Sequence, residues 1–396
     1  MENFKIADHS GLTILTKHYY KPANTSDLTD FLTKNPTLKL RIGGGLTGVS
    51  GGAVPYENEH FIDLKAFNKL RWEDKNAGIV RAEAGVTMKQ IQEFVETEGW
   101  FFPIMPGMPY ATIGGLVACN GGGPMSLKYG KIGNYVLGLE LVMANGERIN
   151  VGGTLTKNSE GIDFTKLFVG SEGTLGIITS VFLQCVPKIQ EIYYYRIAAD
   201  SFEEIVDLIP TLLKYAPYLL ETAEKEALKF TSKVNESVIW LAVNSQLQLS
   251  FSTNYRISEH DQEIMSERFQ IGHSLQKYKP FIDLDVSFPM NTSKKAVMEL
   301  KQLLMHNQLE NIVFGHGGNG NWHIHVFFNN DQEKWEQYQQ KFDEIIIENK
   351  GVISGEHGIG RIHKERFVRK SQPFQKEIYT ALKQQLDPNN RFPSLY

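Results

Sequence analysis

Three glycine-rich stretches follow one another in the first half of this chain of 396 residues. They read RIGGGLTGVSGG at residues 41–52, TIGGLVACNGGG at residues 112–123 and GSEGTLGIIT at residues 170–179. A glycine turn after a strand can present bare backbone amides as a nest for an anion such as a pyrophosphate. One such stretch is about as often an ordinary tight turn, but three in order within one domain argue against that interpretation.

The first stretch matches neither of the two common phosphate-binding motifs. It is not followed by Gly-Lys-Ser or Gly-Lys-Thr, which a P-loop requires. It is also not followed by a long helix, and no acidic residue stands where the Rossmann pattern would place one. We therefore expect these turns to belong to a different kind of nucleotide-binding fold.

Strand and helix signals alternate around these turns. Thr87 and Gln90 form a capping box that predicts the start of a helix. Apolar residues 138–143, followed by Asn145-Gly146, predict a β-hairpin. Further strands are expected at residues 38–42, 61–64 and 79–83. Strands and short helices are mixed here, which indicates an α+β domain.

The composition changes after Pro187 and indicates a second region. Ser201 and Glu204 form another capping box, and Ser293 begins a second helical pattern. Strands are expected at residues 193–197, 238–243, 247–251, 312–314 and 324–328, and later helices at residues 330–350 and 375–386. This pattern predicts an antiparallel sheet backed by helices. We place the domain boundaries at residues 1–188, 189–350 and 351–396.

Composition excludes several classes of protein. The two cysteines, Cys119 and Cys185, lie far apart, so neither a disulfide framework nor a cysteine zinc site is expected. The formal net charge of -4 and the lack of a basic block argue against nucleic acid as the main partner. No apolar run reaches the length of a membrane span, and no signal peptide is visible. We expect a cytoplasmic protein, with peripheral membrane contact left open.

Histidines and a glutamate cluster in two further glycine-rich stretches, GHGGNGNWH at residues 315–323 and SGEHGIG at residues 354–360. His316, His323 and Glu356 are the usual side chains of a catalytic zinc site with one open position. His357 can then serve as a base. Glycines beside each ligand would let substrate and backbone approach closely.

The spacing of the two histidines sets a condition on the fold. His316 and His323 are seven residues apart, which would not place both on one face of a regular strand. The glycine loop between them would have to fold His316 back toward His323. Polar loop histidines without a metal are the alternative interpretation.

Two other residues are candidates for contacts with a substrate. Asn321 can contact the substrate or the surroundings of the metal, although a turn-forming asparagine is an equal alternative. Arg256 follows a strand-like segment and can clamp a substrate carboxylate, although a solvated surface arginine is an equal alternative.

Taken together, the five stretches resemble a known family. The first three resemble the FAD-binding domain of the vanillyl-alcohol oxidase flavoprotein superfamily. With the histidine motifs they resemble its D-2-hydroxyacid dehydrogenase branch, which includes D-lactate dehydrogenase, the glycolate oxidase flavin subunit and D-2-hydroxyglutarate dehydrogenase. The resemblance runs from about Lys21 to the C-terminus. It implies an α+β fold with a two-part FAD-binding domain, a cap domain with an antiparallel sheet, and a C-terminal segment returning to the FAD domain.

The resemblance also implies which residues hold the FAD. The FAD pyrophosphate would be wrapped by Gly43, Gly44, Gly45, Leu46, Thr47, Gly48, Val49 and Ser50. The flavin and its phosphates would be lined by Pro106, Thr112, Gly114, Gly115, Asn120 and Gly121, and the adenosine side would be held by the backbone of Gly173 and Ile178. Members with covalent FAD often have a histidine in the first turn. Leu46 and Thr47 stand there, so we expect FAD to be bound non-covalently.

By the same resemblance, His316, His323 and Glu356 would bind a divalent metal, with Zn2+ expected, and His357 would be the general base. A 2-hydroxy acid would chelate the metal, which lowers the pKa of its hydroxyl. Hydride would leave C2 for flavin N5 and a 2-oxo acid would result. The electron acceptor, whether quinone, cytochrome, electron-transfer flavoprotein or oxygen, is left open.

Two positions depart from the family pattern. Asn319 replaces an aspartate that usually follows the first histidine, which removes a negative charge near the metal. Asp283 stands where members acting on 2-hydroxyglutarate carry a lysine, although Lys279 is nearby. A small substrate such as D-lactate or glycolate is therefore favoured. The alternatives are a metal-dependent hydrolase and a flavin-binding subunit of a larger redox complex.

Overall fold

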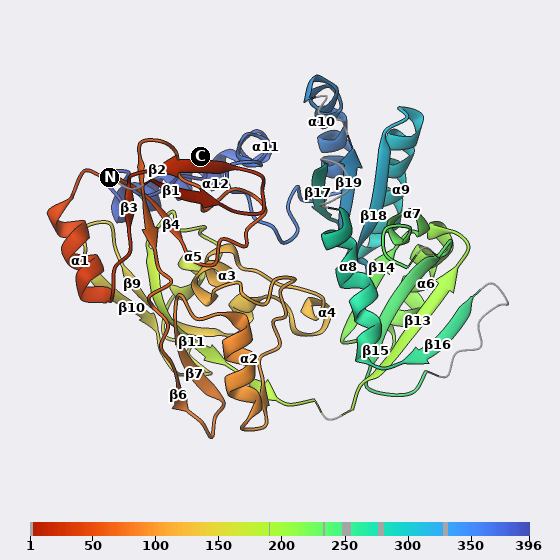
Figure 1. The fold of residues 1–396 in the computed structure, drawn as a ribbon, viewed down its shortest axis with the longest axis horizontal. Helices are drawn as coiled ribbons and strands as arrows, with labels where there is room; N and C mark the ends of the chain where they lie inside the picture. Colours follow the sequence, from red (N-terminus) through yellow and green to blue (C-terminus); the bar gives the residue numbers. More distant parts are fainter. Residues whose placement is uncertain (1–2, 190, 233, 248–254, 276–280, 328–331) are drawn as a thin grey trace. The chain divides into compact units, whose positions relative to one another are not determined.

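The computed structural model describes residues 3–189, 191–232, 234–247, 255–275, 281–327 and 332–396 (Figure 1). The chain forms two compact units. The first consists of Met1–Gly123, Lys131–Lys188 and Glu356–Tyr396, and the second of Pro124–Gly130 and Ile189–Gly355. Helices and sheets occur in both units, so the predicted α+β class is confirmed.

The first unit is built on two main sheets. A parallel sheet has the order β3-β5-β4 and contains β3 (Tyr19–Tyr20), β4 (Lys39–Gly43) and β5 (Glu59–Asp63). An antiparallel sheet has the order β10-β9-β11-β7-β6 and contains β6 (Leu70–Asp74), β7 (Ile79–Glu83), β9 (Val136–Val142), β10 (Arg148–Gly152) and β11 (Ile177–Gln184). The predicted Asn145-Gly146 turn joins β9 to β10, and Gly146 adopts a φ of 86° there.

Shorter elements complete the first unit. Two small strand pairs are β1 (Phe4–Ala7) with β2 (Thr13–Thr16), and β8 (Trp100–Phe101) with β12 (Val186–Pro187). The helices are α1 (Thr25–Lys34), α2 (Met88–Glu96), α3 (Ile113–Cys119), α5 (Thr165–Phe168), α11 (Lys364–Lys370), α12 (Pro373–Leu386) and the 3-10 helix η1 (Ile132–Asn134). The capping box predicted at Thr87 begins α2.

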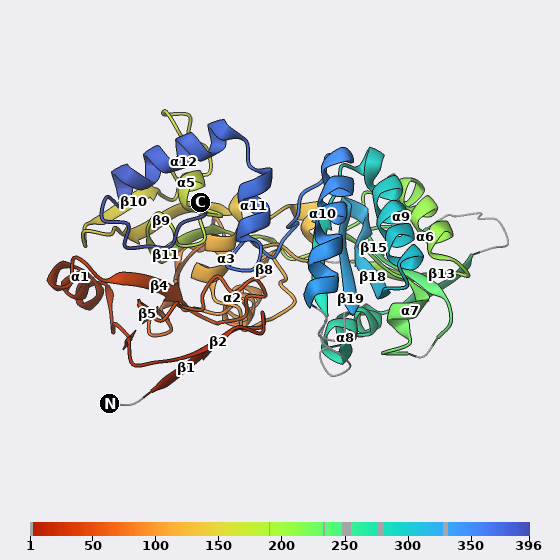
Figure 2. The same cartoon turned by 90° about the horizontal axis from the view of Figure 1, so that it is seen from above.

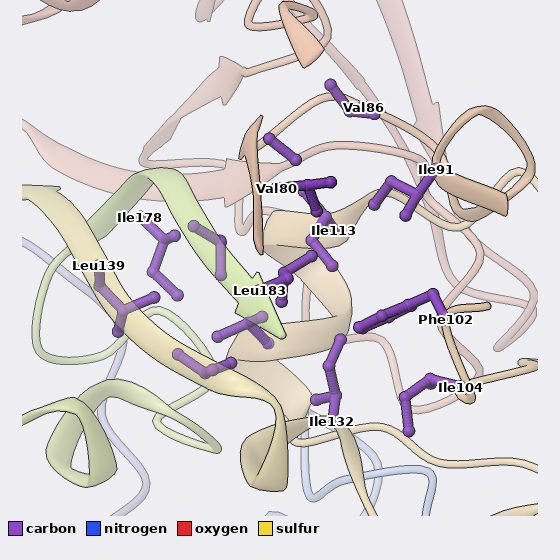
Figure 3. Packing of buried hydrophobic residues seen from close by; sticks show 14 of the residues in the cluster. Val80, Val86, Ile91, Phe102, Ile104, Ile113, Ile132, Leu139, Ile178 and Leu183 are labelled. Carbon is purple, nitrogen blue, oxygen red and sulfur yellow. The ribbon is translucent and has the colours of Figure 1, made fainter. Parts of the chain in front are cut away.

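One hydrophobic core fixes α3 against the antiparallel sheet. Val80, Leu139 and Leu183 come from three neighbouring strands and are fully buried. They pack in the same cluster as Phe102 and Ile113, the first residue of α3 (Figure 3). Burying such side chains stabilises the fold by about 1.5–3 kcal/mol each. The second glycine-rich stretch, which forms α3, therefore has a rigid base.

The second unit is built on one antiparallel sheet with the order β16-β13-β15-β14-β18-β19-β17. Its strands are β13 (Tyr193–Ala199), β14 (Leu219–Ala223), β15 (Ser237–Val243), β16 (Arg256–His260), β17 (Ile282–Ser287), β18 (Glu310–His316) and β19 (Asn321–Phe327). The predicted antiparallel sheet is therefore confirmed. Most of the strand expected at residues 247–251 lies outside the described residues.

Helices lie on both faces of this sheet (Figure 2). They are α4 (Ser126–Tyr129), α6 (Phe202–Leu213), α7 (Lys225–Leu228), α8 (Met265–Leu275), α9 (Met290–His306) and α10 (Gln332–Glu348), with the 3-10 helices η2 (Gln262–Ile264) and η3 (Gly317–Asn319). Met265 and Ile271 of α8 pack with Trp240 and Phe314 on one face. Trp322 points to the other face, where its indole N–H donates to Ser293 of α9 at 2.9 Å.

The ends of the expected helices shift slightly. The helix expected from Ser293 begins at Met290, and the last helix begins at Pro373. The first residues of the helix expected at 330–350 lie outside the described part of the chain. No helix within the described residues combines the length and the apolar character needed to span a membrane.

Candidate active site

The first glycine-rich stretch begins within β4, at Arg41, and packs directly against the second. The amide of Gly45 donates to the hydroxyl of Thr112 at 3.2 Å. A Cβ on Gly44 would lie 2.3 Å from that hydroxyl, and a Cβ on Gly45 would lie 2.9 Å from the carbonyl oxygen of Tyr110. Glycine is therefore required here because the two stretches approach each other closely.

The turn after Gly45 presents backbone donors without acceptors. Leu46 adopts a left-handed φ of 54°, which is unusual for a residue with a side chain. In the part of the chain that the structure describes, the amides of residues 46–50 donate no hydrogen bond to protein. Consecutive free amides in a glycine turn form a concave anion site. This observation fits the pyrophosphate role expected for Gly43 to Ser50.

The second stretch has one packed face and one open face. A Cβ on Gly114 would lie 2.7 Å from the Cβ of Ala84, so this glycine packs against β7's end. Gly115 and Cys119, one helical turn apart, are exposed. The open face of α3 therefore leaves room for a ligand along residues that the sequence predicts as flavin-lining.

Three other predicted flavin residues have partners inside the protein. The side-chain oxygen of Asn120 accepts from the amide of Gly133 at 3.1 Å. Gly121 packs against Leu116, since a Cβ there would lie 2.9 Å from the leucine side chain. Pro106 follows the segment against which Gly123 packs. The side chain of Asn120 therefore stabilises this loop through its bond to Gly133.

The third stretch contains Gly173, which has open space beside it, and Ile178, whose backbone is unpaired on the side of β7. Gly173 adopts a φ of 71°, and a Cβ there would meet no atom within 4 Å. The side chain of Ile178 is buried in the core (Figure 3). The ladder between β11 and β7 starts only at Ser180, so the backbone of Ile178 is unpaired on that side. Contacts through backbone, as predicted for both residues, are compatible with this arrangement.

The two histidines of the fourth stretch lie on a tight hairpin in the second unit. His316 ends β18 and pairs with Asn321, while His323 in β19 pairs with Phe314. Opposite residues of an antiparallel pair share a face, as do residues two apart on one strand. The hairpin therefore brings both imidazoles to one face, with ring centroids 5.6 Å apart. Both histidines are buried.

Three glycines of this hairpin lie very close to neighbouring atoms of the second unit. A Cβ on Gly315 would lie 2.6 Å from the carbonyl oxygen of Asn321. Cβ atoms on Gly317 and Gly318 would lie 2.7 Å from the Thr222 side chain and 2.6 Å from the Leu127 side chain. The small size of these three glycines is therefore required for packing of the hairpin within its own unit. Close approach of a substrate at these glycines stays a prediction.

A glutamate that sequence reasoning missed holds His316. The register of β14 against β18 pairs Thr222 with Gly315 and so places Glu221 beside His316. The Glu221 carboxylate is fully buried, and its Oε1 lies 2.5 Å from Nδ1 of His316. Its Oε2 accepts from Nε of Arg268 in α8 at 2.9 Å. A carboxylate on Nδ1 fixes the ring and leaves Nε2 for a metal. The signal in the sequence was a glutamate inside an apolar strand.

Asn321 holds the neighbouring strand. Its side-chain amide donates to Asp285 at 2.8 Å and to the carbonyl oxygen of Val286 at 3.1 Å. Asp285 in turn accepts from the Ser354 hydroxyl at 3.1 Å, and its carbonyl accepts from the amide of Gly355 at 3.0 Å. These contacts bind the fifth stretch, up to Gly355, to β17.

Two of the expected metal ligands lie together within the second unit. His316 and His323 each offer an imidazole nitrogen from the same face of the hairpin. Glu356 directly follows Gly355, so the bond from Gly355 to β17 helps to set its position. Two imidazole nitrogens and one carboxylate oxygen form a donor set that suits Zn2+ and leaves a coordination position open. The donor chemistry therefore fits the metal that the resemblance implies.

The two residues that depart from the family pattern, Asp283 and Asn319, both lie in the second unit. Asp283 lies with its Oδ1 3.4 Å from Nε2 of His325 and 3.9 Å from Nδ1 of His323. His325 also stacks on Phe281, with centroids 4.1 Å apart, as expected for an ordinary sheet residue. Asn319 has a buried side-chain oxygen that accepts no hydrogen bond from any described residue. Lys279 lies outside the described residues.

Arg256 does not join the histidines. It begins the edge strand β16, which lies four strands from β18 and therefore about 19 Å away at the usual strand spacing. Its guanidinium pairs with Asp200 at 2.9 Å and with Glu236 at 3.1 Å, and the residue is exposed. Here the alternative interpretation, a surface arginine, matches the geometry.

His357 lies in the C-terminal loop of the first unit. Its carbonyl oxygen accepts from the Ser50 hydroxyl at 3.0 Å, which ties the loop to the first glycine-rich stretch. Nε2 of His357 lies 3.6 Å from a carboxylate oxygen of Glu356. The imidazole is partly exposed, as a group that exchanges protons with a ligand must be.

Known proteins resemble this chain over nearly its whole length. A family model described as an FAD binding domain matches residues 16–152, and one described as the C-terminal domain of FAD linked oxidases matches residues 258–393. A D-lactate dehydrogenase of Archaeoglobus fulgidus is 31% identical, covering 93% of this chain and 88% of that protein. Glycolate oxidase subunit GlcD of Bacillus subtilis is 30% identical, covering 93% and 86%.

A solved structure shows the same fold. Alkyldihydroxyacetonephosphate synthase superposes with a TM-score of 0.71 and 14% identity, covering 96% of this chain and 77% of the solved chain. At this identity the likeness concerns the fold alone. It agrees with the fold class that the family resemblance implied, an FAD-binding domain followed by a second α+β domain.

Proposed function

The chain belongs to the family of FAD-linked oxidases, and on that premise we propose that it oxidises a small D-2-hydroxy acid, such as D-lactate or glycolate, to the 2-oxo acid. The observation that carries the proposal is the pair of buried histidines on one hairpin face, His316 and His323, in a chain of this family whose Glu356 directly follows the Gly355 that is bonded to β17. A 2-hydroxy acid carries a carboxylate and a neighbouring hydroxyl, which together chelate a divalent metal. The hydrolase alternative loses its support because both family models describe FAD proteins.

FAD is proposed to bind non-covalently in the first unit. Residues 43–50 would hold the pyrophosphate through the free amides of the turn, and the open face of α3 at Gly115 would lie along the flavin. Thr112, Gly114, Asn120, Gly121 and Pro106 shape that face, and Gly173 and Ile178 would contact the adenosine side. Bound FAD supplies a hydride acceptor, N5, for the hydrogen at C2 of the acid.

The metal is proposed to be Zn2+, held by His316, His323 and Glu356. A divalent cation at this point lowers the pKa of a coordinated hydroxyl. Glu221 would keep Nε2 of His316 directed to the metal, because it occupies Nδ1. His357 would take the proton of the hydroxyl as general base. Asn321 would act by holding β17.

The preference for a small monocarboxylate is supported by Asp283. Its carboxylate lies 3.9 Å from Nδ1 of His323, so a second carboxylate of a substrate would meet a like charge there. Replacing Asp283 by lysine is expected to raise activity with D-2-hydroxyglutarate relative to D-lactate. The ratio of kcat/KM for the two acids measures this, and an unchanged ratio would speak against this role of Asp283.

Each of the three expected segments would have its own role in the reaction. Residues 1–188 would act as the FAD-binding domain, 189–350 as the cap that binds substrate, and 351–396 as the returning segment that supplies Glu356 and His357. The reduced flavin would pass electrons to a quinone, a cytochrome or an electron-transfer flavoprotein. A cytoplasmic location, at or near a membrane surface, would suit such acceptors.

Anaerobic mixing with a panel of D- and L-2-hydroxy acids tests the proposal. Flavin absorbance should bleach with a D-acid or glycolate and remain with L-acids. His357→Ala should keep FAD but slow the bleaching by about 10²- to 10⁴-fold, while His306→Ala, an exposed histidine at the end of α9, serves as the matched control. Bleaching at the wild-type rate in His357→Ala would refute the assigned base, and a flavin that no acid reduces would refute the reaction.

A further inference from the structure

Glu172 has an unusual backbone in the third glycine-rich stretch. Its φ is 53°, a left-handed conformation that residues with side chains adopt mainly where their surroundings hold them. Its amide donates to the carbonyl oxygen of Ala118 in α3 at 2.8 Å, and the preceding Gly170 donates to Val117 at 3.0 Å. The third stretch therefore rests on the helix formed by the second, which fixes Glu172 in this strained conformation.

The carboxylate of Glu172 accepts two backbone hydrogen bonds from the loop that carries His357. The amide of Ile359 donates to Oε1 and the amide of Gly360 donates to Oε2, both at 2.7 Å. Gly358 and Gly360 adopt φ values of 79° and 52°, and such turns direct successive amides to one side as an anion nest. The nest of the Glu-His-Gly-Ile-Gly segment is thus occupied by a carboxylate of the same unit.

Glycine at position 358 is explained by the same contact. A Cβ on Gly358 would lie 3.0 Å from Oε1 of Glu172. Burial raises the pKa of the Glu172 carboxyl above its usual value, and the two amide donors and the charge of Arg41 offset only part of this rise. Bonds from two amides are strongest to an ionised carboxylate.

A second anchor comes from the first glycine-rich stretch. The hydroxyl of Ser50 donates to the carbonyl oxygen of His357 at 3.0 Å. The carbonyl oxygen of Ser50 accepts from the amides of Arg361 at 2.9 Å and Ile362 at 3.2 Å. The base is therefore held on both sides by stretches that also form the candidate flavin cradle.

We propose that Glu172 is a positioning residue that fixes the loop of His357 and so couples the flavin cradle to the base. The inference rests on the proposed role of His357. Proton transfer requires the base within hydrogen-bond reach of the substrate, and a displacement of about 1 Å can cost on the order of a hundredfold in rate. Loss of the Glu172 bonds frees two amides next to the base and allows such a displacement.

The test uses Glu172→Gln in the full-length, FAD-loaded protein, with Glu83→Gln as the matched control. Glu83 also accepts a backbone amide in the first unit, but from Lys69 at 3.0 Å. Glutamine keeps the shape of the side chain and turns one acceptor into a donor that faces an amide. Flavin absorbance, reduction by dithionite, hydrogen exchange of residues 356–363 and anaerobic reduction by D-lactate or glycolate are measured.

We expect Glu172→Gln to keep FAD and normal reduction by dithionite. Exchange at residues 356–363 should accelerate, and reduction by the acid should slow by about ten- to a hundredfold. Added to His357→Ala, the same change should cause no further slowing, because it acts through that side chain. Glu83→Gln should match the wild type in every measurement.

Three results would overturn the proposal: unchanged exchange, unchanged reduction by the acid, or an equal further slowing in the His357→Ala background. If Glu172→Gln loses FAD to the same extent as it loses activity, Glu172 acts only on FAD binding. That result would also overturn the proposal. If no acid reduces the wild-type flavin, the proposed function fails separately. The exchange result then decides whether Glu172 holds the loop, with faster exchange supporting it and unchanged exchange refuting it.

Discussion

Glu221→Gln tests whether a buried carboxylate tunes the candidate metal centre. Glu221 is fully buried and bridges Nδ1 of His316, at 2.5 Å, and Nε of Arg268, at 2.9 Å. Alanine would leave Arg268 as an unpaired buried charge, which costs about 3–5 kcal/mol and confuses stability with binding. Glutamine keeps an acceptor at the site and removes only the negative charge.

The expected magnitude follows from the hydrogen bond to His316. A bond to a charged group contributes about 1.5–3 kcal/mol, and a neutral bond about 0.5–1.5 kcal/mol. The variant therefore loses about 1–1.5 kcal/mol of support for the ligand ring, which corresponds to roughly tenfold weaker metal binding. Loss of an outer carboxylate partner typically weakens metal binding by about 10- to 100-fold, which agrees with this value.

The assay is competition for Zn2+ between the metal-stripped protein and a chromophoric chelator. Thermal unfolding of the metal-stripped proteins first checks that the variant is folded. Glu236→Gln is the matched control, because it removes a carboxylate paired with Arg196 and Arg256 in the same unit but far from the histidines. Wild-type affinity for Zn2+ in a folded Glu221→Gln would refute the reasoning. Equal weakening in Glu236→Gln would show an effect of net charge instead.

Three further predictions concern the cofactor, the substrate and the pH dependence. Gly45→Ala should weaken FAD binding by about 1–3 kcal/mol through the close approach to the carbonyl of Tyr110, and flavin released on desalting checks this. Arg256→Ala should leave KM for the acid within about twofold, because exposed ion pairs contribute about 0–1 kcal/mol and the residue lies far from His316; a much higher KM would contradict the placement. Burial lowers the pKa of His60 below 6.5, so the unfolded chain binds more protons and stability falls as the pH drops below 6.5. His60→Asn should lose that part of the slope, and thermal unfolding at about pH 7.5 and about pH 5.5 measures it.

Local patterns predicted much of the secondary structure because their causes are local. The capping boxes at Thr87 and Ser201 begin helices as expected, since each needs only residues within one turn. The Asn145-Gly146 turn likewise joins two strands, because glycine accepts a positive φ. Motif order identified the FAD-linked family, which the comparisons confirm.

The residues of the candidate site were visible as chemical types, but their arrangement was not. The sequence by itself determined that His316, His323, Glu356 and His357 stand among glycines, and that the first half carries three glycine-rich stretches. It did not show that a hairpin register would place the two histidines on one face, because register depends on which strands pair.

Only the tertiary structure decided which partners surround these residues. Glu221 is far from His316 along the chain and meets it through β14, and Arg268 of α8 bonds to Glu221 in turn. Arg256 is left on the edge strand. Glu172 likewise bonds to the loop of His357 at Ile359 and Gly360, which lie 187 and 188 residues further along the chain. Such long-range contacts depend on sheet order and helix packing, which residue type and spacing do not encode locally.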